Sequence, residues 1–196
     1  MKVFNKNKYP KIKIVFTDTA YTKIKQLINN IDKEVAWHNT VEKMGENKYV
    51  ITNTLVYPQV IQSAHVEADY EKYADWLFNL PDSKFNKLRA QGHSHVNMRV
   101  QPSGTDLKNQ QEIMTQVKDY YIFMILNKDE DLYIKFIDIE NNIVYEKEDL
   151  EIVISKNENK WHNKMYKKYM REKEYKGKNK TPHFIYHDEK GREIKI

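Results

Sequence analysis

The sequence contains no cysteine, and only five of its 196 residues are glycine and five are proline. The absence of cysteine excludes disulfides, thiolate zinc sites and cysteine nucleophiles, so histidine, aspartate and glutamate remain as metal ligands. No run of 18 apolar residues occurs, which argues against a membrane-spanning helix. Residues 1–6 lack the apolar stretch of a signal peptide. We therefore expect a soluble, cytoplasmic protein with no membrane partner.

Hydrophobic and charged residues are distributed unevenly along the chain. Hydrophobic residues make up 40% of the sequence and aromatic residues 12%, which is enough for a folded domain with its own core. The net charge is +5, but residues 155–196 hold 13 basic and 6 acidic residues, whereas residues 1–154 hold 20 basic and 22 acidic ones. We expect one domain over 1–154 and a basic extension over 155–196.

The extension has patterns of its own. Trp161, Met165 and Tyr169 recur every four residues, which predicts a Lys-rich amphipathic helix that continues to about residue 174. Residues 176–180 are typical of a linker, and residues 183–196 predict a hairpin that turns across 188–191.

Hydrophobic periodicity in the first 154 residues predicts an α/β fold, in which helices pack on a central mixed β-sheet. Thr17 or Asp18 can cap the first helix, and Ser103 is a natural N-cap for the last one. The expected strands cover 11–17, 34–38 with an end near 45, 49–56, 60–66, 91–95, 120–126, 132–139, 143–145 and 151–154, and the expected helices cover 18–30, 67–80, 83–88 and 104–117.

The most informative stretch is the one from Gly92 to Asp106. It holds His93, His95, Ser103 and Asp106 in the spacing His-x-His, seven residues, Ser, two residues, Asp. Residues i and i+2 of a strand point to the same side of a sheet, so both imidazoles face one way, and the first turn of the next helix can bring in the carboxylate. Two imidazoles and one carboxylate suit a catalytic zinc ion, which keeps a fourth position for water.

Two further residues supply the rest of a hydrolytic site. Glu34, a lone carboxylate followed by the anchoring Trp37, is the candidate acid/base that moves a proton from water to a leaving amine. Ser103 can donate a hydrogen bond to the oxyanion of a tetrahedral intermediate, although its use as a helix cap competes with that role.

Taken together, Glu34 with His93, Ser94, His95, Ser103 and Asp106 resembles the JAMM motif of the MPN+ (JAB domain) metalloproteases, in the pattern Glu…His-Ser/Thr-His-x7-Ser-x2-Asp. The resemblance covers about residues 10–154. It implies a cytidine-deaminase-like α/β sandwich and a zinc peptidase or isopeptidase whose protein substrate is ubiquitin or a ubiquitin-like protein. It also implies that His93, His95 and Asp106 bind Zn²⁺, that Glu34 is the acid/base and that Ser103 stabilises the oxyanion.

The sequence departs from the family pattern in two places. Val96 stands where the family often has proline, and Val35-Ala36-Trp37 stands where a Gly-rich segment often follows the glutamate. Neither departure removes a functional group.

Several alternatives stay open at this level. A polar loop followed by a capped helix explains Ser103 and Asp106, but it does not explain the paired histidines. His38 is a surface or core-edge residue, or else a residue that supports the site. The remaining histidines, His65 among them, are surface residues in our interpretation, and Trp37 and Trp76 are core residues. Amidohydrolase barrels need a longer chain, and zinc deaminases need cysteine.

A second hypothesis makes the protein an interaction module. In that case the metal only stabilises the JAB fold, and the basic extension over 155–196 binds nucleic acid or an acidic partner.

Overall fold

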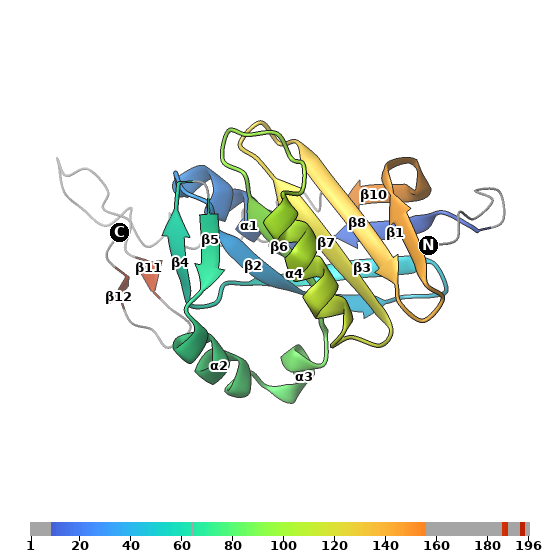
Figure 1. Ribbon diagram of the computed structural model, residues 1–196, viewed down its shortest axis with the longest axis horizontal. Coiled ribbons are helices and arrows are strands. Elements are labelled where there is room, and N and C mark those ends of the chain that lie inside the picture. The colour runs from blue at the N-terminus through green and yellow to red at the C-terminus, as the bar shows by residue number, and fades with distance from the viewer. Residues whose placement is uncertain (1–8, 64, 156–185, 188–192, 195–196) are drawn as a thin grey trace, which may run out of the picture. The chain divides into compact units, whose positions relative to one another are not determined.

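The computed structural model describes residues 9–63, 65–155, 186–187 and 193–194. The chain divides into two compact units, 1–157 and 158–196. The first unit is built on an eight-stranded sheet in the order β10-β1-β3-β2-β6-β7-β8-β9 (Figure 1). Its strands are β1 (Ile12–Phe16), β2 (Ala36–Lys43), β3 (Lys48–Leu55), β6 (Leu88–Ser94), β7 (Tyr120–Leu126), β8 (Leu132–Asp138), β9 (Ile143–Glu146) and β10 (Leu150–Ile154).

The sheet is mixed, because β1 runs parallel to β3 and β10, β6 runs parallel to β7, and the other neighbouring pairs are antiparallel. This agrees with the predicted α/β class. The helices are α1 (Asp18–Asn30), α2 (Tyr70–Phe78), α3 (Asp82–Phe85) and α4 (Gly104–Met114), and a 3₁₀ turn, η2 (Lys147–Asp149), precedes β10.

Helix α1 covers one face of the sheet. Thr17 is its N-cap and accepts the N–H of Ala20 through its hydroxyl, as predicted. Ala20, Ile24 and Ile28 point into the main core, where they meet alternate residues of the central strands. These partners include Trp37, Ile51, Ile122, Met124 and Phe136.

Helix α4 packs on the opposite face, in front of β7 in Figure 1. Tyr121 and Phe123 of β7 point to this side and form a second hydrophobic cluster with Ile137, Ile113 and Met114. All seven residues of β7 are buried, since helices cover both of its faces. The predicted bounds of this strand, 120–126, are confirmed.

The predicted strand over 60–66 is wrong. The structure has two short strands there, β4 (Gln59–Gln62) and β5 (His65–Ala68), which pair as a separate antiparallel hairpin. The β-prone sequence runs through the turn without glycine or proline, so its pattern does not mark the break.

The segment after the hairpin also differs from expectation. Helix α2 begins at Tyr70 instead of Glu67, since residues 65–68 belong to β5. The short helix α3 ends at Phe85, and Leu88, expected to end it, opens β6.

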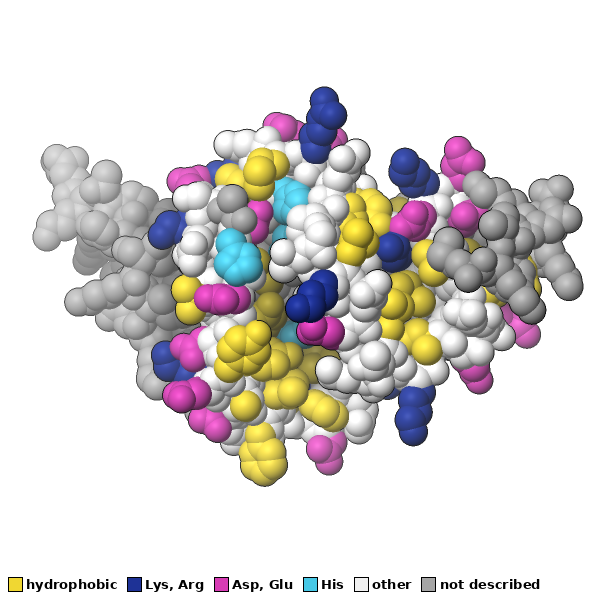
Figure 2. Space-filling view, viewed as in Figure 1, with side chains coloured by type: hydrophobic (Ala, Val, Ile, Leu, Met, Phe, Trp, Pro, Cys, Tyr) yellow, Lys and Arg dark blue, Asp and Glu magenta, His cyan; other side chains and the backbone are white. Residues whose placement is uncertain are grey.

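Trp76, expected in the core, is only half-buried, and α2 has no fully buried residue. Hydrophobic side chains accordingly gather on the surface over α2 and α3 (Figure 2), with Tyr70 and Phe78 being 79% and 90% exposed.

Two other bounds are corrected. Glu34 and Val35 precede β2, which begins at Ala36 and ends at Lys43. Helix α4 ends at Met114, three residues before the expected end. Within the part of the chain that the structure describes, no helix is long and apolar enough to cross a membrane.

In the second unit, β11 (Tyr186–His187) pairs antiparallel with β12 (Glu193–Ile194), as the predicted hairpin requires. The predicted helix over 161–174 and the linker over 176–180 lie outside the described residues.

Candidate metal centre

The three predicted ligands come together at one end of β6. His93 lies in β6, His95 is the first residue after it, and Asp106 lies in the first turn of α4. The N–H of His95 donates to the carbonyl oxygen of Leu126 at 2.8 Å, so the contact with β7 extends past the last residue of the strand. Both imidazoles therefore stand on the α4 side of the sheet, where the helix presents its carboxylate.

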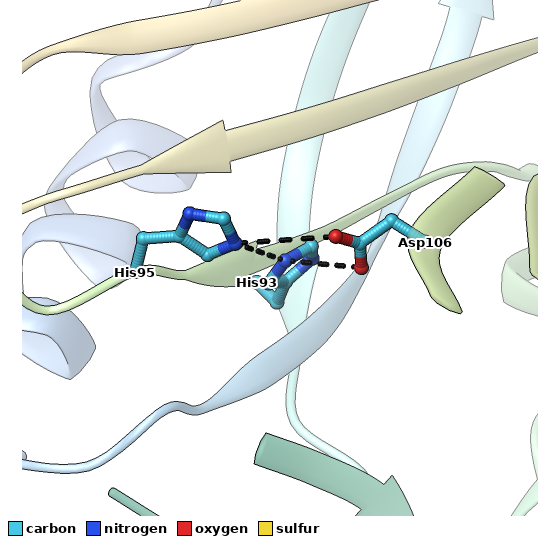
Figure 3. Close-up of side chains that lie close together, drawn as sticks. All are labelled: His93, His95 and Asp106. Atoms are coloured by element: carbon cyan, nitrogen blue, oxygen red, sulfur yellow. Dashed lines mark hydrogen bonds and ion pairs between the residues drawn. The ribbon is translucent and has the colours of Figure 1, made fainter. Parts of the chain in front are cut away.

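The three side chains converge on one point (Figure 3). The Nε2 atoms of His93 and His95 are 3.1 Å apart, and Asp106 Oδ1 is 3.3 Å from His93 Nε2. Asp106 Oδ2 is 4.0 Å from His95 Nε2, and one ligand atom from each residue lies within 4.8 Å of the others. Ligand atoms bound about 2.0–2.1 Å from a tetrahedral zinc ion are separated by about 3.3 Å, so the set can hold a metal ion with little movement.

Neighbouring groups orient two of these ligands. His95 Nδ1 is 2.8 Å from the carbonyl oxygen of Arg99, which favours a proton on Nδ1 and leaves the Nε2 lone pair facing the site. Asp106 Oδ2 accepts both the backbone N–H and the hydroxyl of Ser103, each at 2.7 Å. Its Oδ1 is left facing His93.

The protonation state of His93 suits a metal ligand. Burial lowers the pKa of His93, the charge of Asp106 raises it and the proximity of His95 lowers it, and together they bring the pKa to about 4. The imidazole is therefore neutral at pH 7, as metal binding requires.

Glu34 lies beside this cluster. Its side chain is buried, with 6% of its surface exposed, and burial raises the pKa of its carboxyl above the usual range. The charge of Asp106 raises this pKa as well, whereas His95 and His65 lower it. A carboxyl with a raised pKa beside histidine and aspartate side chains takes up a proton more readily than a free glutamate does, which favours a general acid/base role.

Ser103 caps α4. Its hydroxyl accepts the N–H of Asp106 at 3.2 Å, and its backbone N–H donates to Asp106 Oδ2 at 2.7 Å, and these two bonds form a capping box. The hydroxyl also donates to Asp106 Oδ2. The structure thus displays the capping use of the hydroxyl, and the oxyanion role of Ser103 stays a prediction.

Ser94, between the two histidines, has a contact that sequence reasoning missed. Its side chain is buried and its Oγ accepts the N–H of Val35 at 3.0 Å, while its own N–H donates to the Val35 carbonyl at 2.9 Å. Because 59 residues separate the partners, no local pattern could reveal this contact.

Val96 holds an unusual backbone conformation immediately after His95. Its φ of +43° lies in the left-handed region, which β-branched residues rarely occupy. Proline, which fixes φ near −65°, cannot adopt this conformation. The backbone conformation at residue 96 is therefore one that a proline at this position could not adopt.

Two other histidines lie apart from the ligand cluster. His38 is buried and packs against Tyr57, Tyr73 and Trp76, with its Nε2 2.9 Å from the Tyr73 hydroxyl. His65 is exposed, as predicted.

The sequence matches no family model, and none of the curated proteins with which it was compared resembles it.

Proposed function

We propose that the protein is a zinc-dependent peptidase or isopeptidase of JAMM type. The observation that carries the proposal is the convergence of His93, His95 and Asp106 on one point with a buried glutamate, Glu34, at its side. Two imidazole nitrogens and one carboxylate oxygen are the donor set of a catalytic zinc site with an open fourth position. A site that only stabilises a fold needs neither the open position nor the carboxylate with a raised pKa.

Each residue has a defined task in this proposal. Zinc, when bound, lowers the pKa of a bound water to about 7 and polarises the substrate carbonyl. Glu34 accepts the proton of the attacking water and passes it to the departing amine. Ser103 stabilises the oxyanion if its hydroxyl turns away from Asp106 while its backbone N–H keeps the contact with Oδ2.

The mixed sheet flanked by helices is compatible with the cytidine-deaminase-like JAB fold, which we propose for residues 1–154. By the same resemblance, the substrate is an extended protein tail, such as that of a ubiquitin-like protein. We further propose that the protein acts in the cytoplasm.

Metal analysis combined with one isosteric substitution tests the function. We expect about one zinc per chain in the wild type and in Glu34→Gln, and none in His93→Ala. Hydrolysis of a library of quenched peptides and ε-linked lysine isopeptides should fall about 10²–10⁴-fold in Glu34→Gln, because the proton carrier is lost. Glu71→Gln, on the exposed surface of α2, is the matched control and should cleave like the wild type.

Two outcomes would contradict the proposal. If Glu34→Gln cleaved as fast as the wild type, Glu34 would not be the acid/base. If the wild-type chain bound zinc without cleaving any probe, the interaction-module hypothesis would be favoured instead.

A further inference from the structure

Within the part of the chain that the structure describes, the carboxylate of Glu34 has no fixed side-chain partner of its own. Within the described residues, it accepts no hydrogen bond, although its pKa responds to three neighbouring side chains. Its position is therefore set by the backbone of the segment Glu34-Val35-Ala36, which leads into β2. The contacts that hold this segment therefore determine the position of the Glu34 carboxylate, the proposed catalytic base.

On one side, the segment is bonded to β6 through Ser94. The Oγ of Ser94 accepts the Val35 N–H at 3.0 Å, and the Ser94 N–H donates to the Val35 carbonyl at 2.9 Å. The same hydroxyl lies 3.5 Å from the carbonyl oxygen of Lys33. Because Ser94 stands between His93 and His95, this link ties the segment to the metal ligands.

On the other side, the segment is bonded to the β4–β5 hairpin through Gln59. The side-chain Oε1 of Gln59 accepts the Ala36 N–H at 2.8 Å, and its Nε2 donates to the Ala36 carbonyl at 2.9 Å. One side-chain amide thus makes the two bonds that a neighbouring strand would make. The same Nε2 also donates to the Tyr57 carbonyl at 3.0 Å, which fixes the direction of the side chain.

The backbone of the hairpin adds a third bond. The Glu34 N–H donates to the carbonyl oxygen of Gln62 at 3.0 Å. Glu34 and Ala36 therefore turn their N–H groups towards the hairpin, whereas Val35 turns its N–H towards β6, in the alternation of an extended chain.

We propose that Gln59 is a positioning residue for Glu34, and that it works together with Ser94 as a two-sided clamp on residues 34–36. The proposal rests on the proposed function, in which Glu34 is the acid/base. The β4–β5 hairpin is separate from the main sheet. In this proposal the hairpin controls the position of the base, because a movement of Gln59 releases Ala36 and shifts Glu34 relative to the metal ligands.

Amide hydrogen exchange followed by NMR tests the clamp without any substrate. Gln59→Ala should speed exchange at Ala36 by at least tenfold and leave Val35 protected, whereas Ser94→Ala should expose Val35. Gln59→Glu keeps the oxygen that accepts the Ala36 N–H, so protection at Ala36 should persist in part. Gln62→Ala is the matched control, since its contribution is a backbone carbonyl and its side chain has no hydrogen bond within the described part of the chain.

Kinetics then test positioning. In Gln59→Ala we expect kcat to fall about 10- to 100-fold, with unchanged KM and zinc affinity. Gln62→Ala should keep wild-type kcat. Unchanged exchange at Ala36 in folded Gln59→Ala, or exchange that rises equally at every amide, would overturn the clamp. Failure of the wild type to hydrolyse any probe would instead overturn the proposed function, and the exchange data would still decide whether Gln59 holds residues 34–36.

Discussion

Gly92 lies directly opposite Trp37 in the β2–β6 ladder, and the Trp37 indole occupies the space in which a side chain at residue 92 would stand. A Cβ on Gly92 would lie 2.7 Å from Trp37 Cζ2 and 2.4 Å from Met124 Cγ, closer than real Cβ atoms approach their neighbours. The strand that presents His93 is therefore packed against the core with no room behind it.

Gly92→Ala should lower the free energy of unfolding by about 1–3 kcal/mol, the usual cost of overpacking a core, and should weaken zinc binding because the adjacent His93 shifts. Urea denaturation and zinc titration measure the two effects. Gly104→Ala is the control, since a Cβ there meets nothing within 4 Å. Equal stability of the two variants would mean that β6 can move away from Trp37 freely.

The left-handed backbone of Val96 should cost stability. Holding a β-branched residue in this region costs about 1–3 kcal/mol of folding free energy. Replacing it with glycine removes this strain, but glycine loses more conformational entropy on folding, and that loss offsets part of the gain. We expect Val96→Gly to raise the free energy of unfolding by about 1 kcal/mol and Val96→Pro to lower it strongly. Val100→Gly, at a position without positive φ, should only destabilise. Loss of stability in Val96→Gly would show that side-chain packing outweighs backbone strain.

The Ser103 capping box should affect both the helix and the metal. Ser103→Ala removes the hydroxyl that accepts the Asp106 N–H and donates to Asp106 Oδ2. We expect about 1 kcal/mol lower stability and roughly 10- to 100-fold weaker zinc binding, because the carboxylate is less well oriented. Ser103→Thr keeps the hydroxyl and should retain both properties. Wild-type zinc affinity in Ser103→Ala would mean that Asp106 is oriented without it.

Local patterns predicted the elements that depend on local chemistry. The Thr17 cap and the uninterrupted apolar run of β7 mark their elements within a few residues, and both predictions are confirmed. The β4–β5 hairpin was missed because its turn contains neither glycine nor proline, and its pairing follows from its surroundings.

The candidate site divides in the same way. His93, His95 and Asp106 are close in sequence, so their spacing was enough to predict that their side chains meet in the fold. The position of Glu34 follows from the pairing of Ala36 with His93 across β2 and β6, which the sequence does not display. The hydrogen bonds of Ser94 and Gln59 to the Glu34 segment span 59 and 23 residues, so no local pattern could reveal them.

His38 should make stability depend on pH. Burial lowers the pKa of His38 to about 4, against an opposing effect of the Ala90 backbone, whereas in the unfolded chain its pKa is near the ordinary histidine value of 6.5. Between these values the unfolded state binds the extra proton, so the contribution of His38 is complete above pH 6.5 and is lost as the pH falls towards 4. A tenfold change in proton affinity is worth about 1.4 kcal/mol, so the loss should reach about 3 kcal/mol. Urea denaturation of the metal-free chain from pH 7 to pH 4 measures this effect. The free energy of unfolding should fall more for the wild type than for His38→Phe, by about the loss given above. His65→Gln, at an exposed position, should follow the wild type. Parallel curves for the wild type and His38→Phe would mean that His38 is already hydrated in the folded chain.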